Sequence, residues 1–236
     1  MKLQRKGTRH SHRGVIGVES AIVVIAFVIV AAALAFVVLN MGFTTSQKAK
    51  TTIISGLAES GSSMQISGKV VGVGCTTTTT CLSTPYLNAT AFPMKITSGG
   101  DSVDLSVATT AIKYLSNSVE YDDIYSGPIS TEEHRSLVLA FREAADDGLD
   151  GFSGVINPVN GTVASQTAAF IYWSAQKNTN SILDEGEHAV LAVAYKSADR
   201  PESLDKIRVE VIPATGSSLT VERQVPVITN EVVDLG

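Results

Sequence analysis

The chain has 236 residues, 44% of them hydrophobic and 17% charged, so it has room for one ordinary globular domain and an N-terminal element. Its formal net charge is −5. The first residues are basic, however, which leaves the remainder clearly acidic and excludes nucleic acid as the expected partner. These basic residues are Lys2, Arg5, Lys6, Arg9 and Arg13.

An apolar run follows the basic start. From Ser20 to Leu39 no residue is charged, and neither glycine nor proline interrupts the run. At 1.5 Å per residue, about 20 such residues match the ~30 Å thickness of bilayer hydrocarbon. Burial in lipid or protein overrides the weak helix propensity of β-branched residues. The run therefore predicts a continuous helix, with its basic flank in the cytoplasm and the C-terminal bulk outside.

A cleaved secretory signal, a membrane anchor and a filament-forming helix would each begin in this way. A secretory signal fits less well, because its apolar region is shorter, about 7–15 residues. Here the helical pattern continues through Ile53, Ile54 and Leu57 to a stop at Gly61. A helix over about residues 16–60 would be some 65 Å long, roughly twice what a membrane needs. The excess apolar length requires a second burial environment.

The second half of the chain alternates short apolar segments with turns, which predicts a β-sandwich of immunoglobulin-like architecture over residues 62–236. With the helix over residues 15–61, the predicted fold class is α+β. The segment "HRSLVLAFREAADD" fits either a strand or a short helix, since Leu137, Phe141 and Ala144 share a helical face. The candidate strands are "MQISGKVVGV", "PMKIT", "SVDLSVA", "VEYDDIY", "SLVLAF", "AAFIYW", "AVLAVAY", "KIRVEVI" and "LTVERQVPV".

The only two cysteines, Cys75 and Cys81, flank five threonines. Outside the cell this pair would close a disulfide; the alternative is two free thiols in a threonine-rich loop. Two glycosylation sequons begin at Asn88 and Asn160, and both are expected on surface turns.

The segment "LDEGEH" gathers Asp184, Glu185 and Glu187 in one tight turn. Clustered carboxylates offer the oxygen ligands that Ca²⁺ or Mg²⁺ prefers, and the alternative is a solvated hairpin turn around Gly186. No other cofactor is expected. Neither a nucleophile motif nor a phosphate-binding or dinucleotide-binding fingerprint occurs, so the sequence favours no enzyme class.

Three stretches carry a family pattern. They are "RG" followed by "VIGVESAIVVIAFVIVAAALAFVVLNMGF", then "YWSAQKNTNSILDEGEHAVLAVAY", and finally "LTVERQVPVITNEVVDLG". With these stretches the chain resembles the archaellins, the archaeal flagellins of the type IV pilin-like superfamily. The resemblance implies a helix joined to an immunoglobulin-like sandwich, commonly glycosylated. The first stretch alone would also fit adhesive archaeal pilins, whereas the last favours archaellins.

The resemblance also implies proteolytic processing. In this family a membrane peptidase cuts after a glycine that follows a basic residue, and the matching bond is Gly14–Val15, preceded by Arg13. Residues 1–14 are then a cleaved leader. A second basic–glycine pair, Lys6-Gly7, is disfavoured because cleavage there would leave Arg9 and Arg13 on a helix that packs among apolar groups.

Cleavage at Gly14 makes Glu19 the fifth residue of the mature chain. Pilin-like subunits often carry an acidic residue at that place. A cationic amino terminus at Val15 and the Glu19 carboxylate of another subunit would compensate each other in an apolar bundle and fix the axial register. Alternatively, Glu19 lies at the headgroup level near the helix N-terminus, where the helix dipole favours it. The two interpretations are compatible.

The expected function is a structural subunit of the archaellum filament that polymerises for swimming. The alternative is an adhesive pilin or a single-pass surface binding protein. The expected partners are copies of the chain and other archaellins, the leader peptidase, a membrane platform protein and an assembly ATPase, with the precursor in the cytoplasmic membrane and the filament outside. The expected packing residues are Ile22, Ile25, Phe27, Ile29, Leu34, Phe36 and Leu39.

Overall fold

The structure, a computed structural model, describes residues 13–61, 64–75, 85–129, 131–154, 157–158 and 163–236. The chain divides into two compact units, residues 1–55 and 56–236. The first unit holds most of one helix, and the second holds the sheets and a short helix.

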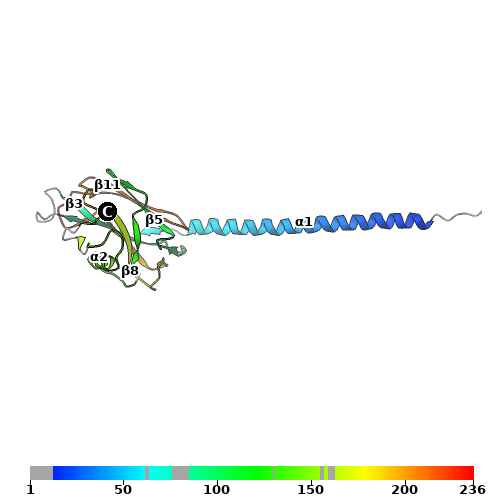
Figure 1. Ribbon diagram of the computed structural model, residues 1–236, viewed down its shortest axis with the longest axis horizontal. Coiled ribbons are helices and arrows are strands. Elements are labelled where there is room, and N and C mark those ends of the chain that lie inside the picture. Colours follow the sequence, from blue (N-terminus) through cyan, green and yellow to red (C-terminus); the bar gives the residue numbers. More distant parts are fainter. Residues whose placement is uncertain (1–12, 62–63, 76–84, 130, 155–156, 159–162) are drawn as a thin grey trace, which may run out of the picture. The chain divides into compact units, whose positions relative to one another are not determined.

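Helix α1 spans Arg13–Gly61, 49 residues without interruption, and is drawn in blue to cyan in Figure 1. At 1.5 Å per residue it is about 74 Å long. The predicted long apolar helix followed by a domain built from β-sheets is confirmed. Glycine is nearly absent from the apolar stretch, and proline is wholly absent from the helix, so no residue breaks it.

The larger sheet has seven strands in the order β13-β2-β3-β10-β8-β7, with β1 also paired to β3. Strands β1 and β2 pair with different parts of the same long strand β3. All neighbours in this sheet are antiparallel except β7 and β8, which run parallel. The strands are β1 (Met64–Ile66), β2 (Val71–Cys75), β3 (Tyr86–Ile96), β7 (Tyr125–Ile129), β8 (Ala168–Ala175), β10 (His188–Ala194) and β13 (Val232–Asp234).

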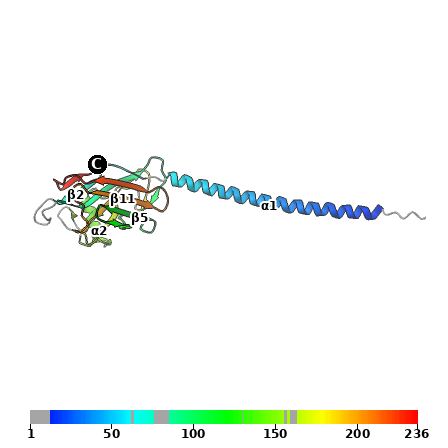
Figure 2. The ribbon, with the colours of Figure 1, turned by 90° about the horizontal axis from the view of Figure 1, so that it is seen from above.

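The second sheet has four antiparallel strands in the order β12-β11-β5-β6. A two-stranded ribbon pairs β4 with β9. Figure 2 shows the domain from a second direction, with β11 and β5 of the smaller sheet in view. The strands are β4 (Val103–Asp104), β5 (Thr110–Ser116), β6 (Glu120–Tyr121), β9 (Ile182–Leu183), β11 (Lys206–Pro213) and β12 (Leu219–Gln224).

The main core lies between the two sheets. Ile171 and Trp173 of the larger sheet and Tyr114 and Val209 of the smaller sheet belong to one buried cluster. Because side chains alternate along a strand, Phe170 and Tyr172 of β8 point to the opposite face, where they belong to a second buried cluster. The predicted sandwich is therefore present, and its larger sheet has a second face to cover.

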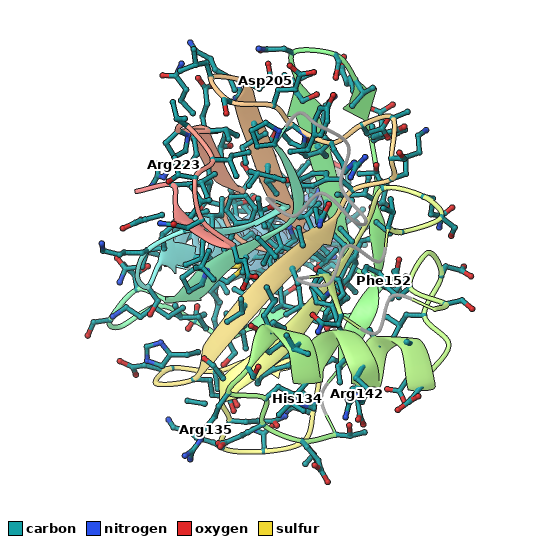
Figure 3. The ribbon with its side chains drawn as sticks, turned by 90° about the vertical axis from the view of Figure 1, so that its left-hand side faces the viewer. His134, Arg135, Arg142, Phe152, Asp205 and Arg223 are labelled. Atoms are coloured by element: carbon teal, nitrogen blue, oxygen red, sulfur yellow. The ribbon has the colours of Figure 1, made fainter. Side chains whose placement is uncertain are left out.

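Helix α2 (Leu137–Asp146) covers that second face. Phe141 of the helix lies edge-on to Phe152 and Phe170, with ring centroids 5.8 and 5.1 Å apart. The helix belongs to the crossover that the parallel pair β7–β8 requires. Figure 3 shows α2 at one side of the domain, with Arg142 on it, and Arg223 toward the other side. The helical interpretation of this segment is correct, and the strand interpretation "SLVLAF" is wrong.

The observed strands differ from the predicted ones in detail. The segment "MQISGKVVGV" forms two short strands, and "SVDLSVA" contributes only the two residues of β4. The candidate "VEYDDIY" reaches β7 only at Tyr125, and three further strands were not predicted at all: β5, β9 and β13. In β5 the buried residues Thr110, Ile112 and Tyr114 alternate with partly exposed ones, so a strand pattern is present. The other two have only two and three residues, too few for a pattern.

Candidate assembly site: the exposed apolar helix

Every described side chain of α1, from Gly17 to Leu57, is exposed within the chain. This stretch is long and apolar enough to cross a membrane, with a mean hydropathy of 3.4 in its most apolar window. Phe27 has 76% of its surface exposed, although a phenylalanine gains about 1.5–3 kcal/mol when it is buried. An exposed apolar surface of this extent requires lipid or other protein to cover it.

The residues predicted to pack are all on this surface and point in different directions. At about 100° per residue, Ile22, Ile25, Ile29 and Phe36 share one face of the helix, whereas Phe27 and Leu34 lie on the opposite face. All of them, with Leu39 nearby, are large exposed hydrophobic residues. A helix that is apolar all round must be surrounded, so a single neighbour would not cover it.

Only three residues between Gly17 and Leu57 carry charge: Glu19 near one end, and Lys48 and Lys50 near the other. All three are exposed. The sequence pattern predicts a role for Glu19 and none for the two lysines. The signal that would have singled out the two lysines is the absence of any other charge from this part of the helix, apart from Glu19.

The predicted processing residues Arg13, Gly14 and Val15 form the first turn of α1 as the structure describes it. The rest of the predicted leader, residues 1–12, lies outside the described residues, and so do the side chains of this turn. Cleavage at this bond therefore stays a prediction.

Asn88 corrects the prediction that both sequons lie on surface turns. It is in strand β3, only 3% exposed, and its Nδ2 donates a hydrogen bond to the carbonyl oxygen of Pro158 (3.0 Å). Thr90 of the same sequon is buried and hydrogen-bonded to the Tyr195 hydroxyl (2.7 Å). The second sequon, at Asn160, lies outside the described residues.

Arg200 lies beside Asn88 and is also buried. One guanidinium nitrogen of Arg200 donates to Asn88 Oδ1 (3.4 Å), and the guanidinium stacks over the Tyr86 ring at 5.1 Å. Asn88 is therefore held from both ends of its amide. The sequon prediction failed because a three-residue motif carries no information on burial.

The predicted disulfide falls outside the described residues. Cys75 is the last residue of β2, paired in register with Tyr86, and its side chain is outside the description. Cys81 lies in the segment 76–84, which is also outside it.

The three carboxylates of "LDEGEH" are engaged in separate hydrogen bonds. Glu187 is fully buried, and its two oxygens accept from the backbone amides of Lys177 (2.7 Å) and Asp184 (3.0 Å). Asp184 accepts from the Ser102 hydroxyl (2.6 Å), and Glu185 from the Gly99 amide (3.3 Å). In the described part of the chain no three acidic, histidine or cysteine side chains form a group that would hold a metal ion.

An ion pair joins the C-terminal segment to the start of the β domain. Lys69 forms an ion pair with Asp234, and the amide of Gly236 donates to Asp234 Oδ1 (3.0 Å). The Lys69 hydrogen bond, with the smaller help of Gly236, lowers the pKa of Asp234 from its ordinary value. Strand β13 pairs here with β2, so the C-terminal segment completes the larger sheet.

An uncovered apolar helix followed by a β domain with its own core defines a class of protein: a subunit whose helix needs lipid or other protein around it. The profile of the archaeal-type flagellin family matches residues 14–223. The chain is 32% identical over 214 residues to probable flagellin 1 of Aeropyrum pernix, covering 91% of this chain and 92% of the relative. It is also 34% identical over 114 residues to probable flagellin 2 of Archaeoglobus fulgidus, covering 48% and 55% of the two chains.

The chain belongs to the archaeal-type flagellin family. Its fold is similar to the solved archaeal flagellum of Methanospirillum hungatei, with a TM-score of 0.56 at 21% identity over 89% of this chain and 93% of that one. It is also similar to archaeal flagellin FlaB1 of Methanocaldococcus jannaschii, with a TM-score of 0.51 at 16% identity over 74% and 96%. The chain is therefore a structural subunit of the archaellum filament, an extracellular surface structure that assembles from such subunits, and not an enzyme.

Proposed function

We propose that helix α1 is the polymerisation element and that it exchanges lipid for copies of itself. The observation that carries this proposal is the exposure of apolar side chains on all sides of α1 from Gly17 to Leu57. Lipid chains and a bundle of like helices are both apolar surroundings, so the transfer costs little hydrophobic free energy. Head-to-tail contacts that do not close then allow subunits to add without limit.

The precursor waits in the cytoplasmic membrane with its basic leader inside. The leader peptidase cuts the Gly14–Val15 bond, after Arg13, and removes five basic residues that the apolar bundle would exclude. A membrane platform protein and an assembly ATPase then drive assembly and rotation, since the chain has no nucleotide-binding motif of its own. Other archaellins join the same filament, and rotation of the filament makes the cell swim.

Glu19 compensates the new amino terminus at Val15 of a neighbouring subunit. A carboxylate and an ammonium group both lose hydration free energy when they leave water. The attraction between the two opposite charges offsets part of that loss. Because the two groups are at fixed positions on their helices, their pairing restricts how far one helix slides along the next.

Two further sites complete the proposal. Asn160 carries a glycan on the outer surface of the filament, and Cys75 and Cys81 close a small disulfide ring in the oxidising exterior. Neither is needed for the packing of α1.

The test is mass spectrometry and electron microscopy of sheared surface filaments. We expect the subunit to begin at Val15. A Gly14→Val variant is expected to remain in the membrane with its leader attached and to form no filaments, whereas the matched Gly7→Val variant is processed normally. A subunit that keeps its leader in the filament, or that remains a membrane monomer in the wild-type cell, would contradict the proposal.

A further inference from the structure

The three charges of the apolar helix have opposite signs at its two ends. Glu19 is separated from Lys48 by roughly 44 Å along the axis and from Lys50 by roughly 47 Å, at 1.5 Å per residue. This distance exceeds the ~30 Å of bilayer hydrocarbon, so in the precursor the two ends lie in opposite headgroup layers. Both ends are hydrated there, and neither needs a protein partner.

A filament bundle takes this hydration away. The same helix cannot pair its own charges, because they are too far apart. Among the residues whose side chains the structure describes, no carboxylate forms an ion pair with either lysine. An ion that is buried without a partner costs several kcal/mol. The charged groups of α1 therefore need partners from other subunits.

The threonine hydroxyls around the two lysines do not compete for such partners. Thr44 donates from its hydroxyl to the carbonyl oxygens of Asn40 (3.1 Å) and Met41 (3.0 Å). The hydroxyls of Thr51 and Thr52 both donate to the carbonyl oxygen of Lys48 (2.9 Å each). These hydroxyls are satisfied within the helix and enter an apolar bundle at little cost. The ammonium groups stand out as the groups in need of an acceptor.

We propose that in the filament the carboxylate of Glu19 pairs with the ammonium group of Lys48 or Lys50 from a neighbouring copy of the chain. The neighbour is parallel and displaced along the axis by roughly 44–47 Å. This inference rests on the proposed assembly through α1 and adds the axial offset between two contacting subunits. The amino terminus at Val15 does not exclude it, because a carboxylate has about four acceptor positions and accommodates two cations.

The two lysines are not equivalent. At about 100° per residue, Lys48 lies within about 20° of the Glu19 face of the helix, whereas Lys50 points about 140° away from Glu19. They therefore face different neighbours, and only one of them is the partner of a given Glu19. Single substitutions distinguish the two.

A charge exchange in the full-length chain tests the pairing. Glu19→Lys and the single variants Lys48→Glu and Lys50→Glu are each expressed, and sheared filament mass is measured together with the N-terminus of the membrane pool. We expect Glu19→Lys and one of the two lysine variants to lower the filament mass by a factor of more than about ten. In each of these variants two like charges face each other. Combining these two substitutions raises the filament mass above that of either single variant; recovery is partial, because the Val15 ammonium group has lost its own carboxylate partner. Lys95→Glu, on the β domain, is the matched control and leaves filament mass unchanged, alone or with Glu19→Lys.

Cysteine cross-linking gives an independent readout. In a Cys75→Ser, Cys81→Ser background that still forms filaments, Glu19→Cys is combined with Lys48→Cys or Lys50→Cys, and oxidised filaments are dissolved in denaturant. The inference predicts covalent dimers and longer chains for one of the two combinations. Glu19→Cys with Val38→Cys, about 15 Å nearer along the axis, is the control and gives neither.

If no lysine substitution rescues Glu19→Lys, and neither lysine position cross-links above the Val38 control, the pairing is wrong. The proposed assembly through α1 stands in that case, provided that wild-type filaments contain subunits beginning at Val15. If wild-type cells show only uncleaved membrane monomers, the assembly proposal itself fails. The two failures are therefore distinguishable.

Discussion

The side-chain amide of Asn88 donates a hydrogen bond to the carbonyl oxygen of Pro158, 3.0 Å away. The nitrogen that a glycan would modify thus already donates a hydrogen bond inside the fold, at a residue with 3% exposure. Two segments separated by about 70 residues are joined by this bond.

We predict that Asn88 is unmodified in the mature subunit. A sugar on Nδ2 would have no space at this buried position in strand β3, against Pro158. Mass spectrometry of proteolytic peptides from sheared filaments checks this. A glycan on the peptide that contains Asn88 would show that the strand is modified before it folds.

Replacing Asn88 should also weaken the β domain. Asn88→Ala leaves the Pro158 carbonyl and the Arg200 guanidinium without this partner, at a cost of about 1–3 kcal/mol. The unfolding midpoint of the domain would fall accordingly. Asn117→Ala is the matched control, since its exposed amide bonds only Asp205 at the surface.

A second prediction concerns Glu187, whose buried carboxylate accepts two backbone amides. Glu187→Gln replaces one acceptor oxygen by an NH₂ group that faces another donor, and we expect a loss of about 2–3 kcal/mol. The exposed neighbour Glu185→Gln should change stability by much less. Equal unfolding midpoints for the two variants would show that the buried bonds contribute nothing.

The same turn tests the metal hypothesis. If the carboxylates of Asp184, Glu185 and Glu187 are committed to hydrogen bonds, added Ca²⁺ leaves the unfolding midpoint of the chain unchanged. If they hold the ion, Ca²⁺ raises the midpoint and a chelator lowers it. Calorimetry with and without Ca²⁺ separates the two results.

A third prediction concerns Gly74 in β2. A Cβ atom at this position would lie 2.5 Å from Ile228 Cγ2 and 3.0 Å from the Asn230 carbonyl oxygen. Gly74→Ala should therefore push the C-terminal segment away from β2 and cost about 1–3 kcal/mol. Gly68→Ala is the control, because its Cβ would meet only Pro93 Cγ at 3.6 Å, an ordinary contact. Denaturant unfolding of both variants against the wild type measures the difference.

The ion pair between Lys69 and Asp234 predicts a dependence on pH and salt. The pKa of Asp234 is lowered from 3.8 in the folded chain, because the ionised form accepts the Lys69 hydrogen bond. Its stabilising effect is complete above the unfolded pKa and is lost as the pH falls through the lowered folded pKa. Both side chains are exposed, so salt screens the pair and the effect is small.

Asp234→Asn should therefore differ from the wild type near neutral pH and low salt, and the difference should vanish in strong acid. Thermal midpoints measured across pH at two salt concentrations check this. The control is Asp101→Asn, whose carboxylate forms no ion pair among the described residues. A difference that persists in strong acid would assign the effect to something other than charge.

The sequence pattern of the segment that forms the short helix α2 does not decide between a helix and a strand. The segment fits both a strand and a helix, and the helix prevails because Phe141 packs against Phe170 of the larger sheet and against Phe152 in the turn that follows α2. Its end is also fixed locally: Gly148, in the left-handed region at φ 71°, donates to Ala145, and Leu149 donates to Ala144. A glycine in the left-handed conformation is a common C-terminal cap of helices, and it is not a feature of strand ends.

The sequence by itself determined helix α1. Its apolar residues surround the axis, so no partner within the chain is needed to define it, and any apolar surrounding suffices. Only the tertiary structure decided that Asn88 is buried, that Glu187 binds backbone amides, and that β13 closes on β2. These outcomes depend on contacts between residues far apart in the chain, and burial of a polar group is settled by its partners, which no local pattern specifies.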